Sequence, residues 1–391
     1  MTELRQLPFD RGDALDISPD FGELRAERPV TKVRTRTGDE AWLITGYDEI
    51  RQVFADDRFV RSHPTPESAP RLSKSVLLGG PNGDYAGEAA AHQGMRRLLA
   101  PAFSARRMRS LSDRITMLVG DLLDRMAEKG PPVDLHEEFS VPLPIQVICE
   151  LLGVPYEDHD LFRSLADAMS DLEDAESAAA AQAEMRAYSY SIVQAKRENP
   201  AEDVYSDLAA SDLPEDEIAR MAGGLLFAGH ETTVNQIDYG VLLFLRNPAQ
   251  RDALLRDPSL VPAAVEEIMR VAAPSEHGIL RYAREDAEVG GVTIRAGDAL
   301  MLATVAANRD ERAFPEPERF DITRDGTEPH VGFGYAIHYC LGASLARVEL
   351  EAVFGSLFQR FPTLRLAVPY ERLTPRADRI TGGFVEVPVA W

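Results

Sequence analysis

Residues 330–351 read HVGFGYAIHYCLGASLARVELE and contain Cys340, one of only two cysteines in the 391-residue chain. Before the cysteine, glycine and aromatic residues from Phe333 to Tyr335 predict a tight irregular loop, and after it apolar residues recur at helical spacing through Val348. Cys340 is therefore predicted to lie at a helix N-terminus. There, free backbone N–H groups and the helix dipole favour a thiolate, the form in which sulfur binds metals. The alternative for a cysteine taken alone is a buried structural thiol.

The spacing of residues around Cys340 resembles the haem-ligand motif of the cytochrome P450 family. The matching positions are Phe333, Ala336, His338, Cys340 and Gly342. The resemblance implies that Cys340 ligates the iron of a haem b, and that Phe333, His338 and Gly342 help to bind this cofactor. One position departs from the family pattern, which has glycine where this chain has Ala336. Glycine permits a positive φ in the loop around the sulfur, and alanine makes that conformation costlier.

A second motif, AGHETT at residues 228–233, lies in the middle of a long apolar helical segment. Polar groups at such a place need partners, and a threonine hydroxyl can bond the carbonyl four residues back. One interpretation is a core helix weakened by glycine. Together with the cysteine motif, AGHETT resembles the oxygen-activating helix of the P450 family. The resemblance implies that Glu231 and Thr232 are the catalytic acid–alcohol pair, and that Ala228 and Gly229 let a flat cofactor approach the backbone.

Haem carries two propionates, which require cations or hydrogen-bond donors when half buried. The residues that match the family's propionate-binding positions are His92, Arg96, Arg281 and His338. His92 and Arg96 are four apart and share one helix face. Each residue alone is typical of a surface. The resemblance is weakest around His92, because Gly94 follows where the family often has arginine.

Glu267 and Arg270 are three apart and can form a charge-assisted pair on one helix face. Such a pair is common on surface helices. Its place between the AGHETT helix and the cysteine loop resembles the family's buried pair, with Arg319 as the expected third member. The resemblance implies a structural role in holding the cysteine loop.

Composition limits the choice of partner and compartment. The net charge is −22 and the pI about 4.8, which disfavours nucleic acid and membrane lipid as partners. Two distant cysteines offer no disulfide framework, and the polar N-terminus lacks a signal peptide or anchor, so a cytoplasmic location is expected. No acidic residue lies between Glu88 and Asp113, whereas arginines gather there: Arg96, Arg97, Arg106, Arg107 and Arg109. This segment is either a solvated helix face or a docking surface for an acidic partner.

The fold class expected from these patterns is mainly α with a minor β region, and the resemblance implies the cytochrome P450 fold in a single domain, residues 1–391. Alternating residues and turn signals place the β region at 30–45, 279–305 and 364–389. Helical periodicity places the body at 93–271 and 341–360. Individual helices are expected at 48–54, 93–99, 104–128, 145–152, 156–170, 175–197, 215–245, 249–256 and 261–271. Residues 61–91 should form a long surface loop.

The resemblance implies a haem-thiolate monooxygenase, an enzyme that inserts one oxygen atom from O2 into a bulky secondary metabolite such as a polyketide or macrolide, by hydroxylation or epoxidation. Electrons would come from a ferredoxin and its ferredoxin reductase, because the chain shows no flavin or nicotinamide site, and a monomer is expected. The alternatives are a hydroxylase of a carrier-bound amino acid or peptide, a peroxide-driven haem-thiolate enzyme, and a non-catalytic haem protein. A zinc protease is excluded, because residue 234, one turn after His230, is valine.

Five segments are expected by resemblance to face the substrate: 61–91, 160–190, 225–228, 273–279 and 380–384. Within them Glu276 and His277 stand out as polar residues. They fit a solvated loop, and a sharper hypothesis pairs Glu276 with a basic group on the substrate.

Overall fold

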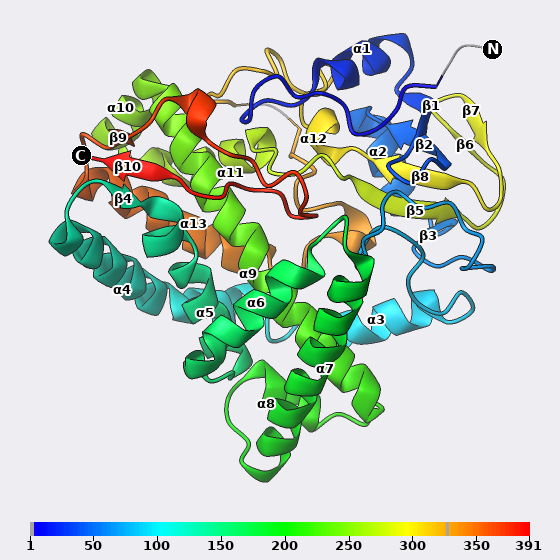
Figure 1. Ribbon diagram of the computed structural model, residues 1–391, viewed down its shortest axis with the longest axis horizontal. Helices are drawn as coiled ribbons and strands as arrows, with labels where there is room; N and C mark the ends of the chain where they lie inside the picture. Colours follow the sequence, from blue (N-terminus) through cyan, green and yellow to red (C-terminus); the bar gives the residue numbers. More distant parts are fainter. Residues whose placement is uncertain (1–3, 326–327) are drawn as a thin grey trace.

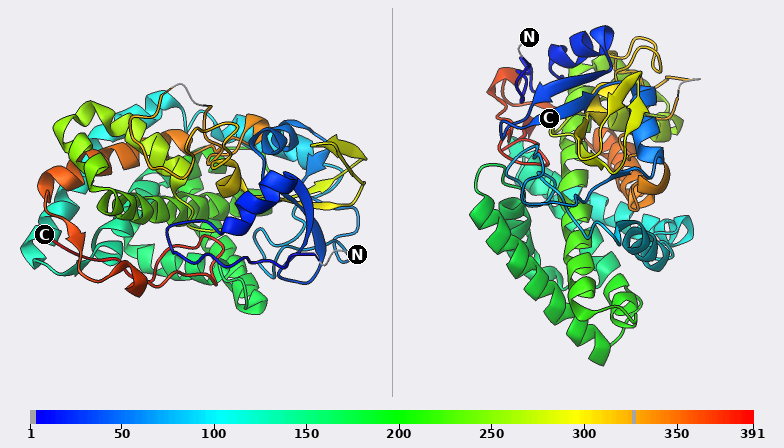
Figure 2. Two further views of the ribbon diagram at one scale, coloured as in Figure 1. Left: turned by 90° about the horizontal axis from the view of Figure 1, so that it is seen from above. Right: turned by 90° about the vertical axis from the view of Figure 1, so that its right-hand side faces the viewer.

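Helix α9, Glu215–Arg246, runs through the middle of the molecule in every view (Figure 1, Figure 2). The computed structural model describes residues 4–325 and 328–391. Three acidic residues occupy the first turn of α9, where they complement the helix dipole, and Pro248 starts the next helix immediately after Asn247. Helices α5, α7 and α11 pack against α9, so both sides of its central part are covered.

The other helices surround α9. Their bounds are α1 Pro19–Glu27, α2 Tyr47–Ala55, α3 Glu88–Leu99, α4 Ala105–Lys129, α5 Pro142–Leu152, α6 His159–Met169, α7 Ala175–Glu198, α8 Val204–Ala209, α10 Pro248–Arg256, α11 Val261–Val271, α12 Thr304–Ala307 and α13 Ala343–Arg360. Short helical turns are η1 His136–Ser140, η2 Tyr156–Asp158, η3 Pro258–Leu260, η4 Ala336–His338 and η5 Tyr370–Arg372. Side-chain caps explain two of the starts, because Asp174 and Asp203 accept backbone N–H bonds at the first turns of α7 and α8.

Most of the β region lies to one side of the helical body (Figure 1). Its strands are β1 Val30–Arg34, β2 Glu40–Ile44, β3 Phe59–Val60, β4 Val133–Asp134, β5 Ile279–Ala283, β6 Ala287–Val289, β7 Val292–Ile294, β8 Ala299–Leu302, β9 Arg365–Leu366 and β10 Pro388–Ala390. The largest sheet has the order β1-β2-β8-β5-β3, with only β2 and β8 parallel. A three-stranded sheet, β4-β10-β9, lies at the helical side, and β6 and β7 form a hairpin.

The helical body has its own apolar core, built by α4, α5, α7, α9, α11 and α13. Helix α13 packs most closely against α4 and α11. It ends at Arg360 because Pro362 disfavours helical backbone at the residue before it. Two smaller clusters cover the faces of the five-stranded sheet, one with α2 and one with α1. The start of α13 is thereby fixed between the helical body and the sheet.

The predicted fold class, mainly α with a minor β region, is confirmed, and most predicted helices begin or end within a few residues of the observed bounds. Helix α3 begins at Glu88 rather than residue 93, because alanines at 89–91 favour helix and Glu88 complements its dipole. Helices α1, α8 and α12 were not expected; the last two are short. In the described parts of the chain, no helix is both long and apolar enough to cross a lipid bilayer.

Candidate functional site

Cys340 lies where the irregular loop meets α13, as its sequence context predicts. The backbone N–H of Cys340 donates to the carbonyl of Phe333 at 2.7 Å, which folds residues 333–340 into a closed loop. Gly342 caps the helix and Ala343 begins it. Phe333 is buried beneath this loop, whereas the Cys340 side chain is exposed. The sulfur is therefore free to bind a group placed against the loop.

The pKa of Cys340 is raised above its ordinary value. Burial among surrounding protein atoms is the largest cause, although the surface of the residue remains accessible. The backbone N–H groups of Gly342 and Ala343 lower the pKa, as predicted for a helix N-terminus, and so do the charges of Arg96 and Arg347, but burial outweighs them. Because metal ligation and loss of the thiol proton are coupled, a metal bound at the sulfur would favour the thiolate.

Ala336 adopts the conformation that the family's glycine would adopt more easily. Its φ is +52°, in the left-handed region, and it starts the short turn η4. The loop therefore keeps its shape at a cost in backbone energy, roughly 1 kcal/mol for a non-glycine residue.

Replacing Ala336 by glycine should stabilise the protein by up to about 1 kcal/mol, because relief of the left-handed strain exceeds the entropy cost of glycine. Chemical denaturation would measure this gain. The matched control is Gly334→Ala, which should destabilise, since Gly334 has a φ of +75° and an added Cβ would lie 2.9 Å from the carbonyl of His338. A loss of stability in Ala336→Gly would contradict the strain argument.

The AGHETT segment opens a gap in the otherwise buried centre of α9. Ala228 and Thr232 are exposed, and the Thr232 hydroxyl donates to the Ala228 carbonyl at 2.9 Å. Glu231 points elsewhere: it is only 7% exposed and accepts a 3.2 Å bond from the Thr381 hydroxyl. Burial raises the pKa of Glu231. The segment thus holds an accessible hydroxyl and, at the preceding residue, a buried carboxyl that points another way and holds its proton more tightly than a free glutamate.

Gly229 has a packing role in addition to the one expected. A Cβ built on it would lie 2.5 Å from Cδ1 of Ile148, so the absence of a side chain lets α5 pack closely against α9. Its contact with the cofactor stays a prediction. Ala228 is exposed on the open part of α9 and stays a candidate for contact with the cofactor.

The four predicted propionate-binding residues form one cluster of arginine and histidine side chains. The rings of His92 and His338 lie 4.9 Å apart, and Arg96 donates to the carbonyl of Tyr339 at 2.7 Å. Arg281 is 4% exposed and stacks on Phe54, with its guanidinium carbon 5.6 Å from the ring centre. All four predicted side chains thus come together next to the cysteine loop.

Sequence reasoning missed a further cation, Arg61, in the loop before α3. Its charge acts on His92, Arg281 and His338, and burial lowers its own pKa. Nothing in the sequence around Arg61 signalled this, because the residue reaches the cluster only through the path of a long irregular loop. Glu88, the nearby acid, uses both carboxylate oxygens to accept the N–H groups of residues 61 and 62 at 2.8 Å each.

This cluster fits the two carboxylates of haem. Burial and neighbouring positive charges lower the pKa of Arg281 to about 10 and that of His338 to about 3. The Nε of Arg281 is buried and has no partner among the described residues. The guanidinium groups of Arg61 and Arg281, which repel each other, and a donor without an acceptor favour an anionic group at this place. A haem with its iron at Cys340 and its propionates at this cluster satisfies both.

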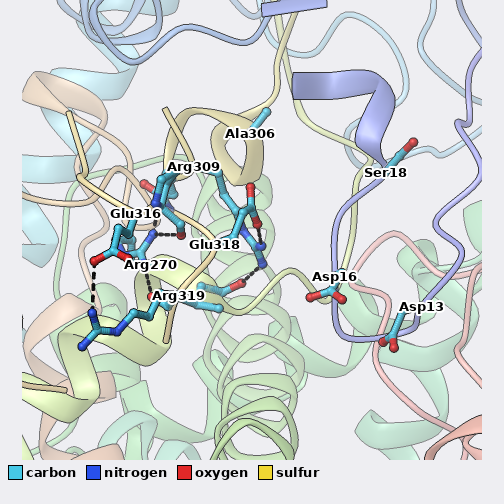
Figure 3. A network of polar contacts seen from close by, with 12 residues as sticks. Asp13, Asp16, Ser18, Arg270, Ala306, Arg309, Glu316, Glu318 and Arg319 are labelled. Atoms are coloured by element: carbon cyan, nitrogen blue, oxygen red, sulfur yellow. Dashed lines mark hydrogen bonds and ion pairs between the residues drawn. The ribbon is translucent and has the colours of Figure 1, made fainter. Parts of the chain in front are cut away.

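The predicted pair Glu267–Arg270 is buried and bidentate, with both hydrogen bonds at 2.8 Å. The prediction that the Arg319 side chain is the third member is wrong, because this side chain is 54% exposed. It pairs with Glu316 instead (Figure 3). Arg270 instead donates to the backbone carbonyl of Arg319 at 3.0 Å. The third charged group is Arg324, whose Nε lies 3.4 Å from the Glu267 carboxylate.

Comparisons with known proteins agree with this site. Residues 191–366 match the family model described as Cytochrome P450. The chain is 45% identical to pentalenolactone synthase of Streptomyces exfoliatus, over 100% of both chains, and 39% identical to mycinamicin IV hydroxylase/epoxidase of Micromonospora griseorubida, over 100% of this chain and 99% of that protein. The solved structure of the putative thioether synthase SgvP, involved in tailoring griseoviridin, superposes with a TM-score of 0.93 at 38% identity and full coverage of both chains. The chain therefore belongs to the cytochrome P450 family, as a haem-dependent monooxygenase.

Proposed function

We propose that this P450 hydroxylates or epoxidises a bulky secondary metabolite, with haem b ligated by Cys340 and electrons supplied by a ferredoxin. The observation that carries the proposal is the opening in α9, where Thr232 is exposed and the preceding residue, Glu231, is a buried carboxyl whose pKa burial raises. A haem carrier needs the thiolate but has no need of this acid–alcohol pair. Reduction of the purified protein under carbon monoxide tests the thiolate ligation directly, through the Soret shift that sulfur ligation gives.

The residues of the chain would divide the work in the following way. Haem, once bound through Cys340, supplies the oxygen chemistry. His92, Arg96, Arg281 and His338 would hold its propionates, and Phe333 and Gly342 would shape the loop around the sulfur. Thr232 would present its hydroxyl to the oxygen side of the site, and Glu231 would supply protons to that hydroxyl. The bond from Thr381 keeps the Glu231 carboxyl oriented.

Replacing Thr232 by alanine should leave reductant consumption within a few-fold of wild type while diverting most of it to peroxide or water, because proton delivery is no longer directed. Product per reductant consumed is the measurement, and we expect it to fall by roughly tenfold or more. The control is Thr233→Ala, since Thr233 is a buried neighbour on another face of the helix. Unchanged coupling in Thr232→Ala would favour a peroxide-driven enzyme or a haem carrier.

A cavity of about 530 Å³ lies beside several of the expected substrate-facing segments, although neither Thr232 nor Cys340 is among its lining residues. It is lined by members of four of the five expected substrate-facing segments: Leu72, Leu172, Glu276, His277 and Gly382. Its volume suits a ligand of drug size. The relatives named as pentalenolactone synthase and mycinamicin IV hydroxylase/epoxidase support a secondary metabolite as the substrate, and a carrier-bound amino acid or peptide stays the alternative.

Glu276 is already engaged within the protein. Its Oε1 accepts the backbone N–H of Ser18 at 2.8 Å and lies 3.7 Å from Nε of Arg11. These contacts fix the N-terminal segment over the cavity, so the hypothesis that Glu276 awaits a basic substrate group loses its main support.

The segment between Glu88 and Asp113, which contains no acidic residue, supports docking of an acidic ferredoxin. Arg97, Arg106 and Arg109 are exposed and have no ion-pair partner among the described residues. Arg107 differs, because it lies 3.6 Å from Asp207 and donates to the carbonyl of Glu202. Unpaired arginines on an acidic protein give a local positive potential that attracts a negatively charged donor.

Reduction by a [2Fe–2S] ferredoxin and its reductase should slow as salt rises, and Arg106→Glu should lower the association rate by roughly tenfold at low ionic strength. Stopped-flow measurement of haem reduction reports this rate. Arg107→Gln is the matched control and should change it less, since Asp207 already compensates the Arg107 charge. A rate indifferent to both salt and Arg106 would refute this docking surface.

We further propose that the chain acts as a single P450 domain and a monomer in the cytoplasm. Both cysteines are free thiols, consistent with a reducing compartment.

A further inference from the structure

A second cavity, of about 440 Å³, reaches Glu231 from outside the body of the molecule. Asp160 and Val385 mark its outer end, where the Asp160 side chain is 87% exposed and Val385 is 55% exposed. Its inner end is formed by Glu231 and His136, which are 7% and 5% exposed. A polar cavity of this size has room for water, and Glu231 lines this cavity and not the one of about 530 Å³.

His136 is held in this cavity by a buried carboxylate. Its Nδ1 lies 2.6 Å from Oδ2 of Asp238, on the same helix as Glu231. Asp238 is fully buried, and its Oδ1 has no partner among the described residues. A contact this short to a carboxylate requires hydrogen on Nδ1, which leaves Nε2 as the nitrogen that exchanges protons. No hydrogen bond to Nε2 is present in the described chain, and His136 lines the cavity.

The charges around His136 favour its protonated form. Burial lowers the pKa of His136, but the hydrogen bond and charge of Asp238, aided by Asp134 and Glu137, outweigh it and raise the pKa above the ordinary value. The surrounding charged groups from each packed element are Asp134, Glu137 and Glu138 of its own segment, Lys129 of α4, Glu150 of α5, Asp160, Arg163 and Asp167 of α6, Glu231 and Asp238 of α9, and Arg376 of the C-terminal segment. Lys129 pairs with Glu138, Arg163 with Glu137, Glu150 with Arg114 and Arg376 with Asp167, so Asp238 acts on His136 without a competing cation.

His230 provides an internal contrast on the same helix. It is 1% exposed, and neither ring nitrogen has a hydrogen-bond partner among the described residues, although its Nδ1 lies 3.8 Å from Oε1 of Glu231. Burial, with the charges of Arg163 and His136, lowers the pKa of His230 to about 3. His230 therefore stays neutral under ordinary conditions, whereas His136 carries the exchangeable proton beside the cavity.

We propose that His136, positioned by Asp238, is the relay residue through which protons from this cavity reach Glu231. In the transfer, Nε2–H of the His136 imidazolium gives its proton through cavity water to the Glu231 carboxylate. This leaves a neutral imidazole, still bonded to Asp238 through Nδ1–H, and a neutral carboxyl. Water from the outer end of the cavity then returns a proton to Nε2. The inference rests on the proposed role of Glu231 and adds the source of its protons.

The first test compares His136→Asn with wild-type holoenzyme. The asparagine amide can still donate to Asp238 but cannot carry a proton to Glu231. The rate of oxygen consumption, driven by a [2Fe–2S] ferredoxin system, should fall roughly tenfold. Its solvent deuterium isotope effect should be at least twice that of wild type. The wild-type rate should decline above the pKa of His136, and the rate of the variant should lack this decline. Glu138→Gln, a neighbour outside the cavity, is the matched control and should behave as wild type. A slower His136→Asn with an unaltered isotope effect and pH profile would mean a structural role and overturn the proposal.

The second test needs no turnover. The chain has eight histidines, so the ring resonance of His136 can be assigned in ¹³C-histidine-labelled protein by its loss in His136→Asn. We expect it to titrate above the ordinary histidine value and to shift downward in Asp238→Asn. A resonance that stays neutral down to acidic pH would refute a proton-carrying His136. Glu231→Gln distinguishes failure of the proposed role of Glu231 from failure of the His136 relay. If Glu231→Gln has the same isotope effect as wild type, the proposed role of Glu231 fails. If the isotope effect changes in Glu231→Gln and not in His136→Asn, only the relay is refuted.

Discussion

Replacing Cys340 by serine is expected to abolish monooxygenase activity and the Soret shift of the reduced carbonyl adduct, while the protein still folds. Folding should survive because the Cys340 side chain is exposed and its backbone N–H bond to Phe333 does not depend on the sulfur. Ligation should be lost because a serine alcohol is far harder to deprotonate than a thiol and gives no sulfur donor to the iron. Visible spectroscopy and circular dichroism on the same sample separate the two effects.

Cys149→Ala is the matched control for this change. Cys149 is 2% exposed in α5, and burial raises the pKa of its thiol to about 12, so it is a structural thiol. Its replacement should lower stability by a modest amount through the cavity it leaves, with the sulfur-ligated spectrum intact. A Cys340→Ser protein that retained that spectrum would remove the basis of the whole site.

Local sequence patterns were sufficient for those parts of the site whose geometry depends on near neighbours. The position of Cys340 before α13 and the bond from Thr232 to the Ala228 carbonyl follow from spacing along one helix or one loop. The positive φ of Ala336 likewise follows from the position it occupies in the cysteine loop. Interactions within a few residues leave a periodic or compositional trace in the sequence.

Contacts between distant segments left no such trace. Gly229 packs against Ile148, which lies 81 positions earlier, and Arg61 joins the cluster of predicted propionate-binding residues from an irregular loop. The buried bond between His136 and Asp238 also joins two elements that nothing in their local sequence connects. Side-chain direction across a packed interface depends on the whole fold, so a single sequence gives the candidates and the structure gives their partners.

Arg270→Ala is expected to destabilise the protein by about 3 to 5 kcal/mol and to release haem, because it leaves the Glu267 carboxylate buried without its main cation. Both residues are at most 4% exposed. Arg270 also donates to the carbonyl of Asn308 at 2.9 Å, and the Asn308 side chain in turn accepts the N–H of Val331 at 2.8 Å. Val331 lies two residues before the closed loop of residues 333–340, so the loss of Arg270 removes support from the segment that leads into it.

Arg324, and not Arg319, contacts the buried Glu267 carboxylate, so the two arginines should differ in their effect on stability. Arg319→Ala should cost at most about 1 kcal/mol, as expected for an exposed ion pair. Arg324→Ala should cost more, about 1 to 3 kcal/mol, because Arg324 is 12% exposed, contacts Glu267 and donates to the carbonyl of Arg319 at 2.9 Å. Denaturant unfolding of the three variants, with haem content measured on each, gives the ranking Arg270 above Arg324 above Arg319. If Arg319→Ala instead lost haem as readily as Arg270→Ala, Arg319 would be the third member after all, because its backbone carbonyl, which Arg270 contacts, is unchanged by the substitution.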